Sequence, residues 1–167
     1  MISMYRASVS VFKRMLKNLD RILDKAVEYA ERRKIEPSAL LHARLAPDMF
    51  HLIRQVQIAT DQAKGTVARL AGLEPPKFED NEASFMDLKA RIAKTLAFLD
   101  SIKPEQIDGS ERREIELPTG GQIVKLNGLD YLLGFGTPNV YFHIATAYAI
   151  LRHNGLEIGK GDFIGDR

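Results

Sequence analysis

The sequence contains no cysteine and no tryptophan among its 167 residues. Without cysteine the chain has no disulfide, no thiolate metal ligand and no thiol nucleophile, which excludes a structural zinc finger and a cysteine protease. Cytosolic proteins work in a reducing compartment where disulfides are rare. We therefore expect a cytoplasmic protein.

An excess of charge of one sign is also missing. The 24 Lys and Arg residues nearly balance the 22 Asp and Glu residues, for a formal net charge of +2. Opposite charges alternate in short runs such as 31–34, which is typical of a solvated surface and not of a nucleic-acid-binding face. No apolar run reaches the roughly 18 residues that a membrane-spanning helix needs. We expect no nucleic-acid partner, no membrane partner and no signal peptide.

The apolar residues that are present recur with helical spacing. In the first segment they return every three, four and seven positions until Pro37, which predicts a long amphipathic helix. Pro47 and Asp48 resemble the first turn of a second helix that runs to about Leu70. Gly72 ends it and the prolines at 75–76 predict a stiff linker.

The second half of the chain begins with a third helix near Ser84, where Ser84 and Asp87 resemble a capping box. Apolar residues alternate over 113–126 around a Gly-Gly pair, which predicts a β-hairpin. A short helical stretch near 130–135 then leads to a fourth helix. We expect Thr137 and Pro138 to be its N-cap and first residue, and the dipeptide 154–155 to end it.

These elements predict one domain over residues 1–167, an all-α four-helix bundle with a β-hairpin between the third and fourth helices. The Gly-Phe-Gly string at 134–136 lacks the third glycine of a dinucleotide-binding motif, and we interpret it as a flexible corner. The glycine-rich tail from residue 156 onward is expected to pack across one end of the bundle. Bundles of this type place their sites between facing helices.

The fourth helix carries one polar stripe on an otherwise apolar surface. Asn139, His143, Thr146 and His153 fall within about a quarter turn of one another. A helix that is apolar on most sides is usually buried, so polar side chains on it need partners. The stripe therefore predicts either a structural hydrogen-bond network or a binding site.

His143 is the best single candidate, because an imidazole can ligate a metal or transfer a proton near neutral pH. The alternative is a core histidine bonded to Asn139, Thr146 or a tyrosine hydroxyl. On the second helix His51 is expected to be solvated or to join a hydrogen-bond network. If that flank is buried, His51 and Gln55, which lie one turn apart, would face His143. The expected ligand pocket consists of Asn139, His143, Thr146, Gln55 and Tyr148.

Other polar residues near these positions have simpler expected roles. His42 is expected at the surface, and His153 is expected to offset the dipole at the end of the fourth helix. Tyr141 and Tyr148 are interpreted as core or dimer-interface residues that can also line a pocket. Arg44 and Arg54 either form salt bridges or hold an anionic ligand.

Several strings together resemble a known group of proteins. They are Arg44-Leu-Ala-Pro-Asp-Met-Phe50, Arg54-Gln-Val-Gln57, Asp130-Tyr-Leu-Leu-Gly134, Tyr141-Phe-His143 and Leu151-Arg-His-Asn-Gly155. The chain resembles, over nearly its whole length, an uncharacterised "domain of unknown function" family of the DinB/YfiT-like superfamily. The resemblance implies a four-helix bundle and frequent homodimers.

Active members of this superfamily hold a divalent metal with one histidine of the second helix and a His-x-x-x-His pair of the last helix. They include thiol-dependent transferases and isomerases. The corresponding residues here are His51 and His143, and Ala147 stands where the pair would have its second histidine. A methyl group cannot ligate a metal, so the metal triad is incomplete.

Three hypotheses follow. The first is a homodimeric bundle that binds a small molecule beside His143. The second is a metal-dependent transferase or isomerase in which His51, His143 and a carboxylate such as Asp48 or Asp61, or water, hold a divalent ion such as Zn, Ni or Fe. The third is a structural or interaction module without a site, which predicts only packed side chains around His143.

Overall fold

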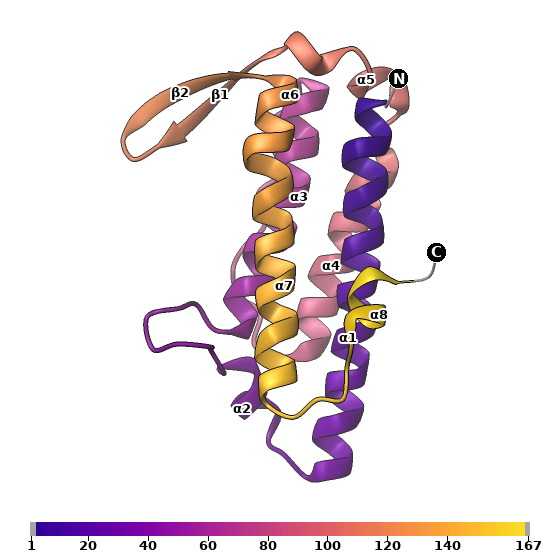
Figure 1. Cartoon of the computed structure of the whole chain (residues 1–167), viewed down its shortest axis with the longest axis vertical. Helices are drawn as coiled ribbons and strands as arrows, with labels where there is room; N and C mark the ends of the chain where they lie inside the picture. The colour runs from indigo at the N-terminus through magenta and orange to yellow at the C-terminus, as the bar shows by residue number, and fades with distance from the viewer. Residues whose placement is uncertain (1–2, 166–167) are drawn as a thin grey trace.

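The computed structural model describes residues 3–165, except for the side chain of Thr119. Four long helices lie side by side: α1 (Val11–Arg33), α3 (Leu52–Ala71), α4 (Phe85–Ser101) and α7 (Thr137–His153). Contacts join α3 to α7 and α4, and α1 to α4 and α7, so each long helix touches two others (Figure 1). The protein is mostly helical with one small antiparallel hairpin, as the sequence predicts.

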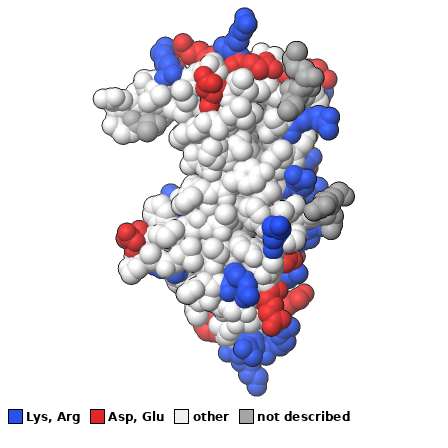
Figure 2. Space-filling view, in the orientation of Figure 1, with Lys and Arg blue, Asp and Glu red and all other residues white. Residues whose placement is uncertain are grey.

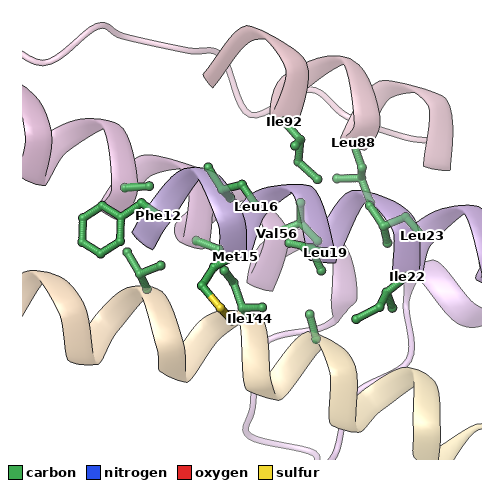
Figure 3. Close-up of a cluster of buried hydrophobic side chains, with 14 of the residues drawn as sticks. Phe12, Met15, Leu16, Leu19, Ile22, Leu23, Val56, Leu88, Ile92 and Ile144 are labelled. Carbon is green, nitrogen blue, oxygen red and sulfur yellow. The ribbon is translucent and has the colours of Figure 1, made fainter. Parts of the chain in front are cut away.

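The core fills the space between these four helices. α1 supplies a buried residue at nearly every turn, which is the burial that its three-and-four spacing predicts. Figure 3 shows these side chains meeting partners from α3, α4 and α7, among them Val56, Ile92 and Ile144. α1 continues a short π-helix, η1 (Arg6–Ser10), without a break.

The start of α3 differs from the sequence prediction. The prediction places Pro47 and Asp48 in its first turn, but both lie in turns, and the helix begins at Leu52. The reason is local: the His51 side chain accepts a hydrogen bond from the Arg54 amide, so His51 is the N-cap. The short helix α2 (Pro37–Leu41) and an irregular segment, residues 42–51, precede it.

Residues 73–83 form the extended linker that the prolines predict, and a buried arginine fastens it. Arg91 of α4 contacts Asp61 of α3 at 2.7 Å, Glu82 at 2.9 Å and Asp80 at 3.0 Å. The ring of Phe78 lies under the cations of Lys64, Arg91 and Lys94. These contacts hold the linker against α3 and α4.

The capping box at the start of α4 is confirmed, since Ser84 accepts from the Asp87 amide and Asp87 accepts from the Ser84 amide. The short helices α5 (Pro104–Ile107) and η2 (Ser110–Arg112) connect α4 to the hairpin. Strands β1 (Glu114–Thr119) and β2 (Gln122–Asn127) pair antiparallel, with Leu117 opposite Val124. Gly120 and Gly121 both have positive φ and form the tip, which confirms the predicted hairpin.

The segment from the hairpin to α7 is one continuous helical rod, which corrects two expectations. α6 (Gly128–Tyr131) passes into a π-helix, η3 (Leu132–Gly136), and then directly into α7. Thr137 is therefore not an N-cap, and residues 134–136 are not a corner. The chain packs tightly here, because a Cβ on Gly136 would lie 2.6 Å from Thr66 of α3.

α7 ends at His153, with Gly155 at positive φ, as predicted. The tail then folds back and forms α8 (Lys160–Ile164), which packs on α1 (Figure 1). Asn18 donates to the Phe163 carbonyl at 2.9 Å, and Lys25 pairs with Asp162 at 2.5 Å. In the described part of the chain no helix is long and apolar enough to cross a membrane.

Candidate functional site

The contact between α3 and α7 brings Gln55 and His143 together, although 88 residues separate them. His143 Nδ1 lies 2.8 Å from Gln55 Oε1. The amide nitrogen of Gln55 donates to the Phe50 carbonyl at 3.0 Å, so its oxygen must be the atom that faces the imidazole. That oxygen only accepts, which assigns the proton of the neutral ring to Nδ1.

His143 is held in its neutral form. Burial lowers the pKa of its imidazole, and the positive charge of Arg54 lowers this pKa further. The residue is 9% exposed. Nε2 makes no hydrogen bond with the described residues, and it is not fully enclosed by them. The lone pair of the unprotonated Nε2 is therefore unused.

One exposed aromatic side chain packs against this imidazole, and a second belongs to the residue whose carbonyl anchors Gln55. The rings of Phe142 and His143 meet edge to face, with their centroids 5.2 Å apart. Phe142 is 57% exposed and Phe50, whose carbonyl anchors Gln55, is 55% exposed. The Arg54 guanidinium lies over the Phe50 ring, 5.8 Å from its centroid. We call Phe50, Arg54, Gln55, Phe142 and His143 the His143 site.

Figure 2 shows the face of the molecule that carries the hairpin and segment 42–51. The surface is hollowed between the hairpin and segment 42–51, and the side chains that line the hollow are almost all uncharged. Helix α7 runs past the hollow from the hairpin toward the end of the molecule that carries α2 (Figure 1). Chemically, the arrangement offers one hydrogen-bond acceptor beside the exposed ring of Phe142.

The remaining stripe residues do not join His143. Asn139 donates to the Phe135 carbonyl and Thr146 to the Phe142 carbonyl, both at 2.7 Å. Each of them is thus satisfied by its own helix, which the helical-wheel argument did not consider. The Tyr148 hydroxyl donates to the Ile158 carbonyl at 3.3 Å and its ring packs on Phe163. Of the five expected pocket residues, Gln55 and His143 are the pair joined by a side-chain hydrogen bond in the described part of the chain.

His51 has a local role at the start of α3. Its Nδ1 accepts the Arg54 amide at 3.4 Å, and its ring packs against His42, with centroids 5.4 Å apart. Burial lowers the pKa of the His51 imidazole, and the nearby charges of His42, Arg44 and Arg54 lower it further. His42 is exposed, as expected.

The arginines and the remaining aromatic residues also have identifiable partners. Arg54 forms the predicted type of salt bridge, with Asp80 at 2.5 Å. Arg44 donates to the Pro47 carbonyl. Tyr141 is half-buried and packs toward Phe163, and His153 is exposed in the last turn of α7. These contacts leave His143 as the one candidate histidine of α7 that faces a side chain of α3.

The residues present do not fit the three-histidine metal site of the superfamily. Ala147 is fully buried one turn after His143 and offers no ligand atom. Asp61, a proposed third ligand, pairs with Arg91 and Lys64. Over residues 3–165, no three histidine, aspartate or glutamate side chains gather in a way that could hold an ion. A two-histidine site formed by His51 and His143 stays an untested prediction.

Sequence reasoning missed Phe50, Phe142 and the proximity of Arg54 to His143. Helical spacing marked Phe142 as apolar, and an apolar residue on such a helix is normally buried, so its exposure could not be foreseen. It also missed a surface hollow of about 580 Å³ between the linker and α4, lined in part by Phe78, Arg91 and Lys94. Its signal was the run of charges that brackets Phe78 in the sequence.

Comparisons with known proteins agree with this architecture. The model of a family described as a domain of unknown function, DUF1993, matches residues 4–164. A DinB family member protein from Shewanella denitrificans, known from its crystal structure, is 44% identical, with a TM-score of 0.92 over 98% of this chain and 92% of that chain. No curated protein matches the chain. The protein thus belongs to the DUF1993 family and has the fold of a DinB family member.

Proposed function

We propose that this protein is a cytoplasmic homodimer that binds a small molecule at the His143 site. The observation that carries the proposal is the hydrogen bond between His143 Nδ1 and Gln55 Oε1, which leaves Nε2 as an unused acceptor on a ring that packs against exposed Phe142. A buried histidine with a purely structural role would have both ring nitrogens satisfied or enclosed.

The chemistry of the site defines the ligand class. Nε2 accepts one hydrogen bond, so the ligand must offer a hydroxyl or N–H donor. The two phenylalanine rings favour an aromatic or apolar body. The positive charge of Arg54 near His143 disfavours a cationic ligand. A small neutral aromatic alcohol or phenol meets these three conditions.

The ligand class is tested with a matched pair of probes, p-cresol and toluene, which differ by one hydroxyl. We expect p-cresol to shift the imidazole signals of His143 in an NMR titration and to bind about tenfold more tightly than toluene, the ratio that one hydrogen bond of about 1.4 kcal/mol supplies. The His143→Leu variant, whose side chain has no hydrogen-bond acceptor, should bind both probes equally. The His153→Gln variant is the control, because it removes an exposed histidine of the same helix.

Equal binding of p-cresol and toluene by the unmodified protein would contradict the proposed role of Nε2. Binding of neither probe at millimolar concentration would favour the third hypothesis, a structural module without a site. The hydrogen bonds of Asn139 and Thr146 to their own helix are the feature that favours that alternative.

The dimer proposal is supported by an apolar stripe along the α6–α7 rod. Leu129, Leu133 and Phe142 are exposed large apolar side chains on the rod, and Pro138 and Ala145 continue the stripe. An apolar stripe of this length on a small soluble protein usually marks an interaction surface.

Light scattering tests the dimer with two matched variants. We expect twice the chain mass of 18.8 kDa for the unmodified protein at micromolar concentration. Phe142→Asp should give the single-chain mass, whereas Met86→Asp should not change the mass, because Met86 is exposed on α4, away from the stripe. A single-chain mass for the unmodified protein would refute the dimer.

The metal-dependent alternative is tested separately. Protein purified without chelator and without a histidine tag is supplemented with divalent metals, and bound metal is measured by elemental analysis. A stoichiometric metal that His143→Ala abolishes would favour the enzyme hypothesis. The lack of any bound metal in supplemented protein would count against it.

A further inference from the structure

Exposed apolar side chains lie on the hairpin and on segment 42–51, at the two ends of the hollow beside α7. On the hairpin, Ile123 is 66% exposed and Val124 is also exposed. On the opposite side, segment 42–51 exposes Leu45 and Phe50. Figure 2 shows the hairpin and this segment projecting on either side of the hollow. In a single chain these apolar side chains stay in contact with water. This exposure costs free energy, which a partner that covers them can recover.

The surface that lines the hollow is suited to contact with the same surface of a second copy of the chain. Residues 131–151 contain no Asp, Glu, Lys or Arg, and the charges resume only at Asp130 and Arg152. A two-fold interface places residues near its axis against the same residues of the partner, so a charge there would face a like charge. An uncharged central stretch avoids that repulsion.

A two-fold axis through the hollow would relate the ends of the two molecules. The hairpin lies at the end of the rod where α6 begins, and segment 42–51 lies farther along α7 (Figure 1). Two copies with antiparallel α7 helices then bring each hairpin to the segment 42–51 of the other copy. In this arrangement the exposed apolar side chains of each hairpin contact those of segment 42–51 in the other copy. The two-fold symmetry limits the assembly to a dimer.

The surface available is large enough for a stable dimer. The rod from α6 to the end of α7 is about 39 Å long at 1.5 Å per residue and about 10 Å wide. Each six-residue strand is about 20 Å long. Each copy would contribute its own hairpin to the contact and also its segment 42–51, which the other hairpin covers. Together these surfaces offer about 800 Å² per copy, which is the size of a standard specific interface.

We propose that the hairpin of a second copy covers segment 42–51 and closes the His143 site. Phe50 belongs both to that segment and to the site, where its carbonyl accepts from Gln55. The site of one copy is therefore open to water until the partner's hairpin packs over Phe50. The inference rests on the proposed dimer, and it adds that each small-molecule site is completed by the other subunit.

The absence of cysteine makes a direct test possible, because any introduced cysteine is the only one in the chain. Ile123→Cys and Leu45→Cys proteins are co-expressed and treated with a short bismaleimide, and the products are identified by mass spectrometry. We expect covalent dimers that join position 123 to position 45. Neither variant should cross-link when expressed alone, because the two hairpins lie at opposite ends of the dimer.

Met86→Cys co-expressed with Ile123→Cys is the matched control and should give no dimer above background, since α4 lies outside the interface. Dimers by light scattering without a 123–45 cross-link would overturn the inference and leave the homodimer intact. A single-chain mass would overturn both. Cross-linking of Ile123→Cys with itself would also overturn it, because that product requires a parallel arrangement.

Discussion

His143 combines burial, an assigned tautomer and a ring nitrogen that makes no hydrogen bond with the described residues. Its Nδ1 proton is fixed by Gln55, which in turn is fixed by the Phe50 carbonyl. The chain of contacts passes from the backbone before α3 to an imidazole on α7. The ionisation of His143 is therefore tied to the stability of the folded protein.

The first prediction concerns pH. In the unfolded chain His143 titrates near its ordinary pKa of 6.5, and in the folded protein its pKa is lower. The unfolded state binds more protons between these two values, so the stabilising contribution of neutral His143 is complete above pH 6.5 and is lost as the pH falls toward the folded pKa. The free energy of unfolding of His143→Gln should fall less steeply below that pH.

Urea unfolding at a series of pH values between about 5 and 8 measures this difference. His153→Gln is the control, because it removes an exposed histidine from the same helix. Carboxylate titrations are common to the three proteins and cancel in the comparison. Parallel profiles for all three would contradict the prediction.

At the scale of elements, the π-helix η3 sets how closely the α6–α7 rod approaches α3. Gly136 packs on Thr66, whereas Gly134, two residues earlier in the same turn, has no other part of the structure within 4 Å of its would-be Cβ. The two glycines therefore differ in purpose: one permits a close approach, and the other only adds backbone freedom.

The second prediction uses this pair. Gly136→Ala should destabilise the protein by about 1–3 kcal/mol, because its Cβ would overlap the Thr66 side chain. Gly134→Ala should stabilise it by about 0.5–1 kcal/mol, because alanine favours helix and meets no neighbour. Chemical unfolding measures both. Equal effects of the two substitutions would show that the close approach is not a constraint.

The third prediction concerns the linker between α3 and α4. Arg91→Met should cost about 3–5 kcal/mol, because it removes the cation that pairs with the buried carboxylate of Glu82 and leaves only the Gln57 amide to bond it. The matched control, Lys94→Met, removes an exposed cation one turn away that also lies over Phe78, and should cost less than about 1 kcal/mol. Unfolding free energies and proteolysis within the linker report the two effects.

Apolar periodicity predicted those helices that bury one regular face against neighbouring helices. α1 has apolar residues at three-and-four spacing, and the capping box of Ser84 and Asp87 marks the start of α4. The start of α3 was predicted too early because Pro47 and Asp48 resemble a helix start, whereas the cap is a histidine, an uncommon residue at that position. Local signals fail where an unusual residue supplies the cap.

At the scale of the whole molecule, the fold is a helical bundle with apolar side chains exposed on one side. α7 is buried against α1 and α3 but exposes Phe142, while the hairpin extends beyond the helices next to it (Figure 1). A face of this type gives the protein a reason to associate, because covering it removes apolar surface from water.

The fourth prediction follows from the coupling of association and folding. If the folded state is a dimer, a tenfold increase in protein concentration should raise the Tm by about 2 °C, because dissociation accompanies unfolding. Scanning calorimetry at two concentrations measures the shift. The shift should persist in Met86→Asp and vanish in Phe142→Asp, and a Tm that does not depend on concentration in the unmodified protein would contradict the prediction.

The sequence by itself determined the presence of the four long helices and the hairpin turn at Gly120 and Gly121, because these depend on spacing and on the properties of single residues. Only the tertiary structure decided which groups meet. Helix packing paired His143 with Gln55 and not with its neighbours Asn139 and Thr146, which bond their own backbone. Periodicity gives the face of a helix but not the rotation and register of the helix packed against it, and that geometry determines the site.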